Sequence, residues 1–350
     1  MQKKKTISDE LVSKCTAKNI PFSVTFELTY YCNLRCKHCY AVNQHRQELA
    51  LETIIDLIDQ LKNLGAFYLS FTGGEIFTRP DIFDILSYGK QKGFFQVLLT
   101  NGTLITREMI PDLQKMRLQG VEISLLGATA ETHEAITGVT GSFEKALNAI
   151  RMLHEAGIFV YSKTTLMREN VHEYIRIKEL ARELGAYPRI SSDIVPRFNG
   201  DTGPQQNRIT WEDRLEHLKS DILDEALISF VDEDGQSTLT CKAGRSLAGI
   251  TPYGDVVPCT VFPVPVGNIY ENSFKQIWYN PDNALLSELR SLGEDDIEKC
   301  SCCEHKAICG RCVAAAYFEH KNLRAPSSQA CENAQWTVHV ARQSRLSAKG

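Results

Sequence analysis

Six runs of β-forming residues alternate along this chain with segments of helical periodicity, and this alternation constrains the fold more than any other feature. The expected strands are residues 22–29, 67–72, 94–100, 121–126, 158–166 and 188–195. In the first helical segment, Leu51, Ile54 and Ile58 recur at the spacing of one helix face. Five segments end on a glycine, which adopts the left-handed conformation without steric cost: Gly65, Gly93, Gly120, Gly157 and Gly185.

Strands that alternate with helices predict right-handed crossovers and a parallel sheet, so the expected fold class is α/β. Eight such units would close a TIM barrel, but only six are visible. A doubly wound sheet is the alternative, and the spacing alone does not exclude it. Both folds place ligands at the carboxyl ends of the strands. The residues that follow the strands are therefore the first candidates for a functional site.

The composition excludes several classes of function. The 350 residues carry a formal net charge of −4, which argues against a broad surface for nucleic acid or for a membrane. No run of 18 apolar residues occurs, and residues 1–20 lack the apolar region of a secretory signal. We therefore expect a cytoplasmic protein, whose 12 cysteines are reduced and serve as metal ligands or catalysts rather than as disulfides.

The cysteines fall into two groups, with none between residues 40 and 240. Cys32, Cys36 and Cys39 follow the first expected strand, whereas Cys15 stands apart and is expected to be a structural thiol. Three thiolates so close together can bind three irons of a 4Fe–4S cube and leave the fourth iron without a protein ligand. Zinc is the alternative, but structural zinc usually has four protein ligands, and His38 is then the nearby candidate for the fourth.

The Cys-x3-Cys-x2-Cys spacing after the first strand resembles the signature of the radical S-adenosylmethionine (SAM) enzymes, and Gly73-Gly74-Glu75 after the second strand resembles another element of that family. The resemblance extends over nearly the whole chain. It implies a partial (β/α)6 TIM-like barrel, expected here at residues 21–225. It also implies a 4Fe–4S cluster whose open iron chelates the amino and carboxylate groups of SAM.

The same resemblance assigns contacts with SAM to individual residues. Gly73 and Gly74 would let the backbone approach the methionine moiety, and the Glu75 carboxylate would accept a hydrogen bond from its ammonium group. His38 would contact the adenine, and Ser124 would contact the ribose.

Thr137 marks a departure from the family pattern. Relatives often have an arginine at this position, between the equivalents of His133 and Gly138. Threonine cannot form a bidentate pair with a carboxylate, so Lys163 is the expected partner of the SAM carboxylate or ribose. The implied reaction is one-electron reduction of SAM to methionine and a 5'-deoxyadenosyl radical, which abstracts a hydrogen atom from the substrate.

The C-terminal cysteines resemble the SPASM extension, a small Cys-rich domain with two auxiliary 4Fe–4S clusters, expected here at residues 226–350 with a hairpin around Gly254. On spacing alone, the two Cys-x2-Cys pairs are also compatible with a zinc site. The resemblance assigns one cluster to four ligands: Cys300, Cys303, Cys309 and Cys331. It assigns the other to Cys241, Cys259 and Cys312, with a fourth iron that is open or bound by Cys302.

SPASM proteins mostly modify peptides or proteins, so the resemblance favours maturation of a ribosomally synthesised peptide by crosslinking, epimerisation or excision. Thr260 stands where sulfatase-maturing relatives have an aspartate, which counts against that branch. Residues 1–20 are too few for a folded recognition domain, although a short helix is expected at 8–15, so we expect a separate small peptide-recognition protein. An electron donor such as flavodoxin or ferredoxin is the other expected partner.

Asp193 lies in a sixth strand that is unusually polar for a buried parallel strand, and it is a candidate base facing the substrate. Within the family, the alternative is a small-molecule enzyme, such as a tetrapyrrole side-chain decarboxylase of heme biosynthesis. Outside the enzymes, the alternative is an electron-transfer or zinc-binding protein. Such a protein would not cleave SAM after reduction.

Overall fold

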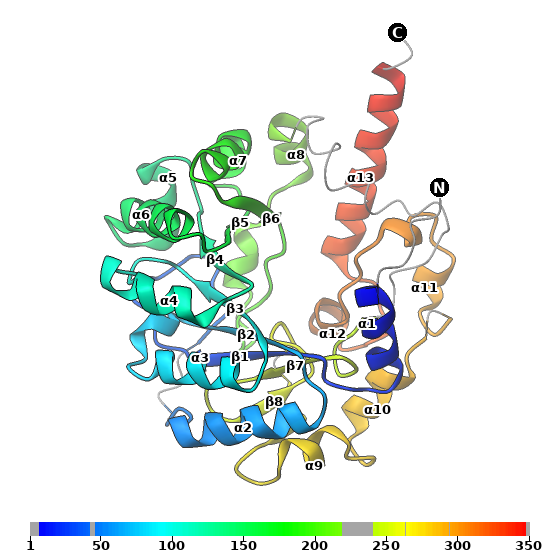
Figure 1. The fold of residues 1–350 in the computed structure, drawn as a ribbon. Helices are drawn as coiled ribbons and strands as arrows, with labels where there is room; N and C mark the ends of the chain where they lie inside the picture. Colours follow the sequence, from blue (N-terminus) through cyan, green and yellow to red (C-terminus); the bar gives the residue numbers. More distant parts are fainter. Residues whose placement is uncertain (1–6, 43–45, 219–240, 263, 294, 348–350) are drawn as a thin grey trace.

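The described residues form one nine-stranded sheet with helices around it (Figure 1). The computed structural model describes residues 7–42, 46–218, 241–262, 264–293 and 295–347. Six parallel strands correspond to the six expected runs: β1 (Ser23–Thr29), β2 (Tyr68–Gly73), β3 (Phe95–Thr100), β4 (Gly120–Ser124), β5 (Val160–Thr165) and β6 (Tyr187–Ser191).

The strand order distinguishes between the two folds that the spacing left open. Along the sheet the order is β6-β5-β4-β3-β2-β1, so each strand lies beside its predecessor in the sequence. A doubly wound sheet would reverse direction at a switch point. The chain instead winds in one direction, as a partial barrel does, and the described sheet is open rather than closed.

Helices cover one face of these six strands. They are α2 (Leu51–Asn63), α3 (Ile82–Gln91), α4 (Ile110–Met116), α5 (Ala130–Thr137), α6 (Ser142–Glu155) and α7 (Tyr174–Glu183). Short 3-10 turns accompany them: η1 (Ile76–Thr78), η2 (Arg107–Met109), η3 (Val171–Glu173) and η4 (Gly203–Asn207). In α2, Ile54 and Ile58 are buried as their spacing predicts. Burial of each such side chain contributes about 1.5–3 kcal/mol, so these faces hold the helices on the sheet.

The two faces of the six strands differ in chemistry. On the helix-covered face, strand residues such as Phe26 and Phe71 are apolar and fully buried. Because side chains alternate along a strand, the other face carries the neighbouring positions, among them Ser124 and Lys163. Parallel strands are usually apolar on both faces, so a polar inner face is the feature that points to a site there.

Three further strands extend the sheet beyond β1: β7 (Leu247–Ile250), β8 (Asp255–Val257) and β9 (Gly267–Asn268). β7 pairs with β1 in parallel, and β8 pairs with β7 in the expected hairpin, whose turn contains Gly254 at φ 82°. The pairing of β7 with β1 was not predicted from the sequence. The expected domain boundary between residues 225 and 226 lies outside the described residues.

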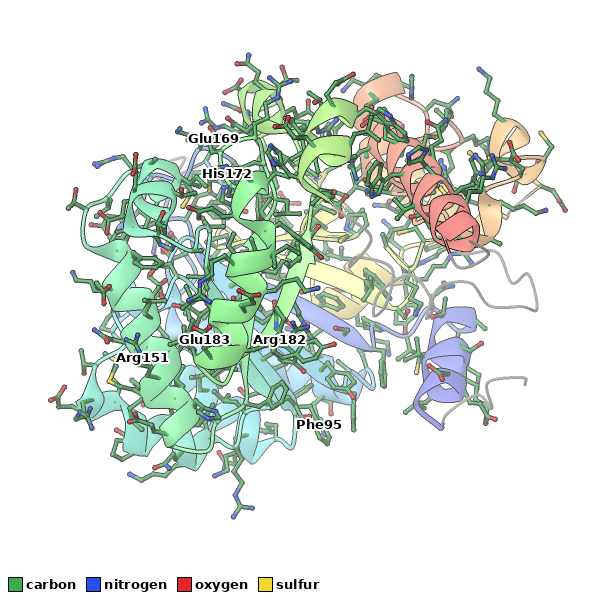
Figure 2. All side chains as sticks on the ribbon, turned by 90° about the horizontal axis from the view of Figure 1, so that it is seen from above. Phe95, Arg151, Glu169, His172, Arg182 and Glu183 are labelled. Atoms are coloured by element: carbon green, nitrogen blue, oxygen red, sulfur yellow. The ribbon has the colours of Figure 1, made fainter. Side chains whose placement is uncertain are left out.

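The C-terminal region lies beside the barrel in both views (Figures 1 and 2). Its helices are α9 (Phe274–Trp278), α10 (Ala284–Ser291), α11 (Glu298–Ser301), η6 (Lys306–Ile308), α12 (Val313–His320) and α13 (Ser328–Ser347), and α8 (Trp211–His217) faces α13 from the barrel side. Helix α1 (Ile7–Ala17) joins this side of the molecule, where Thr16 and Ser246 share a hydrogen bond of 2.7 Å. Across the open side of the barrel, Arg214 donates to Asn333 of α13 at 2.6 Å. Among the described helices, none has the length and apolar character needed to span a membrane.

A neutral histidine supports the loop after β4. The backbone N–H of Leu126 donates to Nδ1 of His133 at 3.1 Å, and burial lowers the pKa of His133 to about 4. The unfolded chain therefore binds this proton as the pH falls below about 6.5, whereas the folded chain does not. We expect the free energy of unfolding to fall by up to about 3 kcal/mol between pH 7 and pH 4 because of His133. Chemical denaturation at several pH values measures this free energy. If it fell as steeply with pH in His133→Gln as in the wild type, His133 would not be the cause.

Candidate iron–sulfur and SAM site

The SAM-cluster group, defined as Cys32, Cys36 and Cys39, lies in the loop after β1, at the carboxyl end of the strand. Its thiols lie close enough to act on one another. Burial raises the pKa of Cys36 to about 12, and the charges of Cys39 and Cys32 raise it further. The Cys32 sulfur also accepts from the backbone N–H of Leu34 at 3.4 Å and from the side-chain amide of Asn101 at 3.9 Å. The loop thus gathers three thiols at the edge of the sheet where the sequence predicted them.

Helix α5 anchors the cysteine loop. The backbone N–H groups of Arg35 and Lys37 donate to the carbonyls of Thr137 and Ile136 at 2.9 and 3.1 Å. The Thr137 side chain is 1% exposed, and its hydroxyl shares a hydrogen bond of 2.8 Å with Ser142. The Thr137 hydroxyl is therefore already hydrogen-bonded in the core. The position where relatives often have an arginine offers no cation here.

Gly73 and Gly74 allow the turn after β2 to pack against the end of β1. A Cβ atom on Gly73 would lie 2.2 Å from the carbonyl oxygen of Thr29, and one on Gly74 would lie 2.1 Å from that of Tyr31. The two backbones are in addition joined, because the N–H groups of Gly74 and Glu75 donate to those carbonyls at 2.7 and 2.9 Å. The glycines are thus required by the contact between two segments of the chain, whatever room they also give to a ligand.

The Glu75 carboxylate ties the ends of β2 and β3 together. It is fully buried and accepts from the backbone N–H groups of Phe77 and Asn101 at 3.1 and 2.8 Å. The Thr100 hydroxyl lies within 2.7 and 2.8 Å of its two oxygens. Any bond to a SAM ammonium group would have to replace one of these contacts.

His38 carries an unpaired nitrogen beside the cysteine loop. Its Nδ1 atom is buried and has no hydrogen-bond partner among the residues that the structure describes. Burial lowers the pKa of His38 to about 4, so the imidazole is neutral and Nδ1 can accept or donate one hydrogen bond. Next to it, Lys37 pairs with Glu169 at 3.2 Å; Figure 2 labels Glu169 beside His172. A neutral ring with a free nitrogen suits a heterocyclic ligand.

Ser124 and Lys163 are register neighbours on the inner face, near the carboxyl ends of β4 and β5. Both are partly exposed. On β6, Arg189 is the register neighbour of Lys163, and it forms an ion pair with Glu122. Within the described ranges, Lys163 has no ion-pair partner. The inner face therefore presents one unpaired ammonium group close to the SAM-cluster edge of the sheet.

A buried carboxyl group on the inner face of β1 was not predicted from the sequence. Glu27 is 1% exposed and accepts from the hydroxyls of Tyr30 at 2.7 Å and Tyr40 at 3.0 Å. Burial raises its pKa to about 7, although both tyrosines oppose the rise. The available signal was a glutamate inside an otherwise β-forming run. Because Tyr40 directly follows Cys39, this contact also fixes the end of the cysteine loop.

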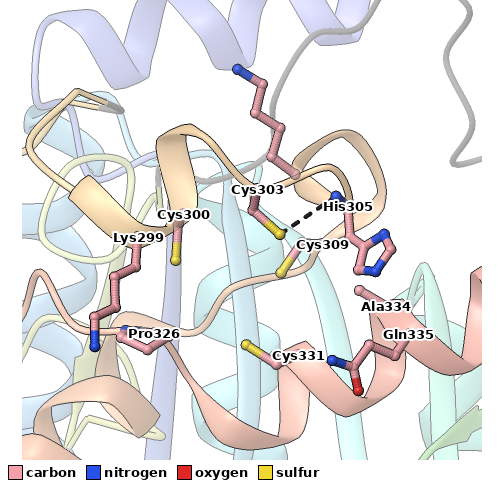
Figure 3. A pocket seen from close by; sticks show the side chains of 10 residues that line it. Lys299, Cys300, Cys303, His305, Cys309, Pro326, Cys331, Ala334 and Gln335 are labelled. Atoms are coloured by element: carbon pink, nitrogen blue, oxygen red, sulfur yellow. Dashed lines mark hydrogen bonds between the residues drawn. The ribbon is translucent and has the colours of Figure 1, made fainter.

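Four C-terminal thiols surround one pocket, which we call the four-thiol pocket (Figure 3). It is lined by Cys300, Cys303, Cys309 and Cys331 and has a volume of about 210 Å³. The four sulfur atoms point toward a common space in Figure 3. The backbone N–H of His305 also donates to the Cys303 sulfur at 3.4 Å. These are the four residues that the sequence analysis assigned to one auxiliary cluster.

The other three assigned cysteines form the three-thiol group: Cys241, Cys259 and Cys312. Burial raises the pKa of Cys259 to about 11, and the charges of the other two thiols raise it further, so the three lie together. Asp193 was expected inside the sixth strand, but it lies two residues after β6 ends, and its carboxylate accepts from the Ser191 hydroxyl at 3.0 Å. The next residue, Ile194, donates to Gln329 of α13 at 3.4 Å, so the exposed Asp193 lies on the side of the barrel that faces the C-terminal region. Cys302 is exposed and does not line the four-thiol pocket.

The arrangement of thiols fits a polynuclear cluster better than a single ion. Tetrahedral zinc draws four ligands to about 2.0–2.3 Å from one point. A 4Fe–4S cube instead needs thiolates spread around a cavity, as in the four-thiol pocket. A donor set of thiols alone is compatible with both zinc and iron–sulfur clusters, so the preference rests on the pocket.

Comparisons with known proteins agree with this geometry. A profile of the Radical SAM superfamily matches residues 26–181, and the SPASM profile, an iron-sulfur cluster-binding domain, matches residues 241–304. An AdoMet-dependent heme synthase of Methanosarcina barkeri is 33% identical over 85% of this chain and 93% of its own. Mycofactocin maturase MftC of Mycobacterium tuberculosis is 32% identical over 93% of this chain and 86% of its own.

A solved structure shows the same fold. Streptococcus suis SuiB bound to precursor peptide SuiA superimposes with a TM-score of 0.70 at 17% identity, covering 93% of this chain and 80% of SuiB. The matching profiles, the similar relatives and the shared fold together show that the chain belongs to the radical SAM superfamily. It is a radical SAM enzyme with a C-terminal SPASM domain, and its cofactors are SAM and 4Fe–4S clusters that include auxiliary ones.

Proposed function

We propose that this enzyme modifies a peptide, in the maturation of a ribosomally synthesised precursor. The observation that carries the proposal is the likeness to mycofactocin maturase, which extends over 93% of this chain and so spans both cysteine regions. The antilisterial bacteriocin subtilosin biosynthesis protein AlbA of Bacillus subtilis, 28% identical over 87% of this chain, adds a second relative named for peptide biosynthesis.

A tetrapyrrole is the second candidate substrate, because the Methanosarcina barkeri relative is a heme synthase. The inner face of the sheet favours a peptide. Tetrapyrroles of heme biosynthesis carry several carboxylates, which need several cations. The strand residues of the inner face include Lys163 and Arg189 as cations, and Arg189 is paired with Glu122. Among the described strand residues of the inner face, Lys163 is then the cation without an ion-pair partner, and the proposal assigns it to SAM.

In this proposal the SAM-cluster group holds the cluster that binds SAM, whose reductive cleavage supplies a 5'-deoxyadenosyl radical. The backbone of Gly73 and Gly74 flanks the methionine moiety, and the Glu75 carboxylate accepts from its ammonium group in place of one of its present contacts. The remaining contacts fall to side chains: the neutral His38 ring to the adenine, Ser124 to the ribose and Lys163 to the carboxylate. Asp193 is proposed as a base for the substrate, since it is exposed toward the C-terminal region.

Lys163→Met should weaken SAM binding about tenfold or more, because a charge-assisted hydrogen bond contributes about 1.5–3 kcal/mol. Equilibrium dialysis of SAM with the cluster-loaded protein measures this. Lys145→Met is the matched control, since Lys145 is exposed on α6, on the helix-covered side. Unchanged SAM affinity in Lys163→Met would remove this residue from the site.

The proposal includes two partners: a separate small protein that recognises the peptide, and an electron donor such as flavodoxin or ferredoxin. Fluorescence anisotropy of a labelled peptide, with and without the small protein, tests the first. Turnover with flavodoxin and its reductase in place of dithionite tests the second. A peptide that binds this chain equally well without the small protein would remove that partner.

Mass spectrometry tests the proposed function. The cluster-loaded enzyme is incubated with SAM, reductant and each short peptide that the neighbouring genes are found to encode, with Cys36→Ala as control. We expect a mass change in the peptide that requires both SAM and Cys36. Conversion of an iron-containing or iron-free coproporphyrin, with no change in the peptide, would establish the tetrapyrrole alternative instead.

A further inference from the structure

One arginine lies between the two C-terminal groups of thiols. Arg311 stands in the sequence between Cys309 of the four-thiol pocket and Cys312 of the three-thiol group. It is 4% exposed, so its guanidinium is removed from water. A cation in such a place is costly unless an anion or several acceptors compensate it.

Two carbonyls hold the guanidinium in place. Its Nε and Nη2 atoms donate to the carbonyl oxygen of Ala325 at 2.9 and 2.6 Å, and Nη2 also donates to that of Leu323. Both acceptors lie in the segment between α12 and α13. The third nitrogen, Nη1, is buried and has no hydrogen-bond partner among the residues that the structure describes. The fork is thus fixed on one side by backbone carbonyls, and on the other it interacts with the side chain of Cys300.

The charge of Arg311 acts on thiols of both groups. Thiols of both groups belong to or pack against one apolar cluster of the C-terminal region: Cys300, Cys309, Cys241 and Cys312. The guanidinium of Arg311 interacts electrostatically with all four. No carboxylate forms an ion pair with Arg311 within the described ranges. The anions available to compensate it are therefore thiolates, and thiolates become permanent anions only when they bind iron.

We propose that Arg311 is the shared counter-cation of the two auxiliary clusters, and that its Nη1 donates a hydrogen bond to a sulfur of one of them. Positive charge and hydrogen bonds to sulfur stabilise the reduced form of an iron–sulfur cluster. Arg311 therefore raises the reduction potentials of both clusters together. It is a positioning residue that acts through the clusters. The proposal rests on the auxiliary clusters of the proposed function.

Arg290 provides a matched control. It is another arginine of the C-terminal region with a buried nitrogen that has no hydrogen-bond partner in the described residues. Its Nε donates to the carbonyl of Gly244 at 2.8 Å, and its guanidinium lies over the Trp278 ring, 5.0 Å from the centroid. The charges that act on it are those of Tyr279 and Arg245, and neither is a proposed ligand. The variant Arg290→Gln therefore removes an arginine of the same region without removing a charge beside the clusters.

The experiment is a redox titration followed by electron paramagnetic resonance. The wild type is first shown to bind about 12 iron atoms per chain, as three cubes require; about four would refute the auxiliary clusters themselves, independently of Arg311. Signals are assigned with Cys241→Ala and Cys309→Ala, each expected to lack one auxiliary cluster. Arg311→Gln should then make both auxiliary clusters at least tenfold harder to reduce, a shift of about 59 mV per electron. The SAM-binding cluster should be unchanged, as should all three clusters in Arg290→Gln.

Arg311→Lys separates charge from structure, because lysine keeps the charge and loses the fork. If the reduction potentials of Arg311→Lys lie between those of Arg311→Gln and the wild type, the proposal is supported. It is also supported if Arg311→Lys retains the auxiliary iron that Arg311→Gln loses. Unchanged potentials in Arg311→Gln with about 12 irons bound would overturn it. Loss of auxiliary iron from both variants would also overturn it, because a structural brace then accounts for Arg311.

Discussion

Replacing Cys36 with alanine is expected to abolish the formation of 5'-deoxyadenosine, a loss of roughly 1000-fold or more. Cys36 lies among the three thiols at the carboxyl end of β1, where their charges act on one another. Two thiolates cannot hold a cube that leaves one iron open for SAM. The bound iron should therefore fall from about 12 to about 8 atoms per chain. Chromatography of the reaction with SAM and dithionite measures the nucleoside, and iron analysis measures the cluster.

Cys15→Ala is the control for this prediction. Cys15 is a buried thiol on α1 that lies outside every proposed ligand set. Its replacement should leave both the iron content and SAM cleavage close to those of the wild type. If Cys36→Ala retained SAM cleavage while Cys15→Ala lost it, the site would have been placed on the wrong cysteines.

Replacing Cys309 with alanine is expected to remove one auxiliary cluster while the SAM-binding cluster remains. Cys309 is buried, lines the four-thiol pocket and belongs to the core of the C-terminal region. Iron should fall to about 8 atoms per chain. SAM cleavage without substrate should continue, whereas peptide modification should stop. The midpoint of thermal unfolding should also fall, because the cluster joins the segment before α12 to α13.

Cys302→Ala tests whether a cysteine outside the proposed ligand sets binds iron. Cys302 is exposed and lies outside the pocket, although its neighbour Cys303 lines it. We expect this variant to keep about 12 irons. A loss of four irons would show that Cys302 is a ligand, and would supply the fourth ligand that the three-thiol group lacks.

Much of the fold followed from local pattern. The six strand runs and their helices carry a strong periodic signal, and the turn at Gly254 was expected from its residue types. The pairing of β7 with β1 was missed, because residues more than 200 positions apart in the sequence carry no local sign of their contact. The choice between a partial barrel and a doubly wound sheet also depended on strand order, which spacing does not encode.

The candidate site also has one part that the sequence predicted and one part that it did not. Cysteine spacing identified the ligand candidates, because each thiol must reach the same cluster from a short loop. The role of Gly74 toward Tyr31 was not visible in the sequence, since it depends on the approach of two backbones. Glu27 and Arg311 were missed for a related reason. Their importance comes from burial and from neighbours brought together by the fold.

The central claim is that the SAM-cluster group supports reductive cleavage of SAM. The most direct test is to reduce the anaerobically reconstituted protein with dithionite in the presence of SAM and to quantify 5'-deoxyadenosine and methionine. We predict that both products form in equal amounts and only when reductant is present. Protein that carries about 12 irons and binds SAM, yet releases no 5'-deoxyadenosine, would contradict the account.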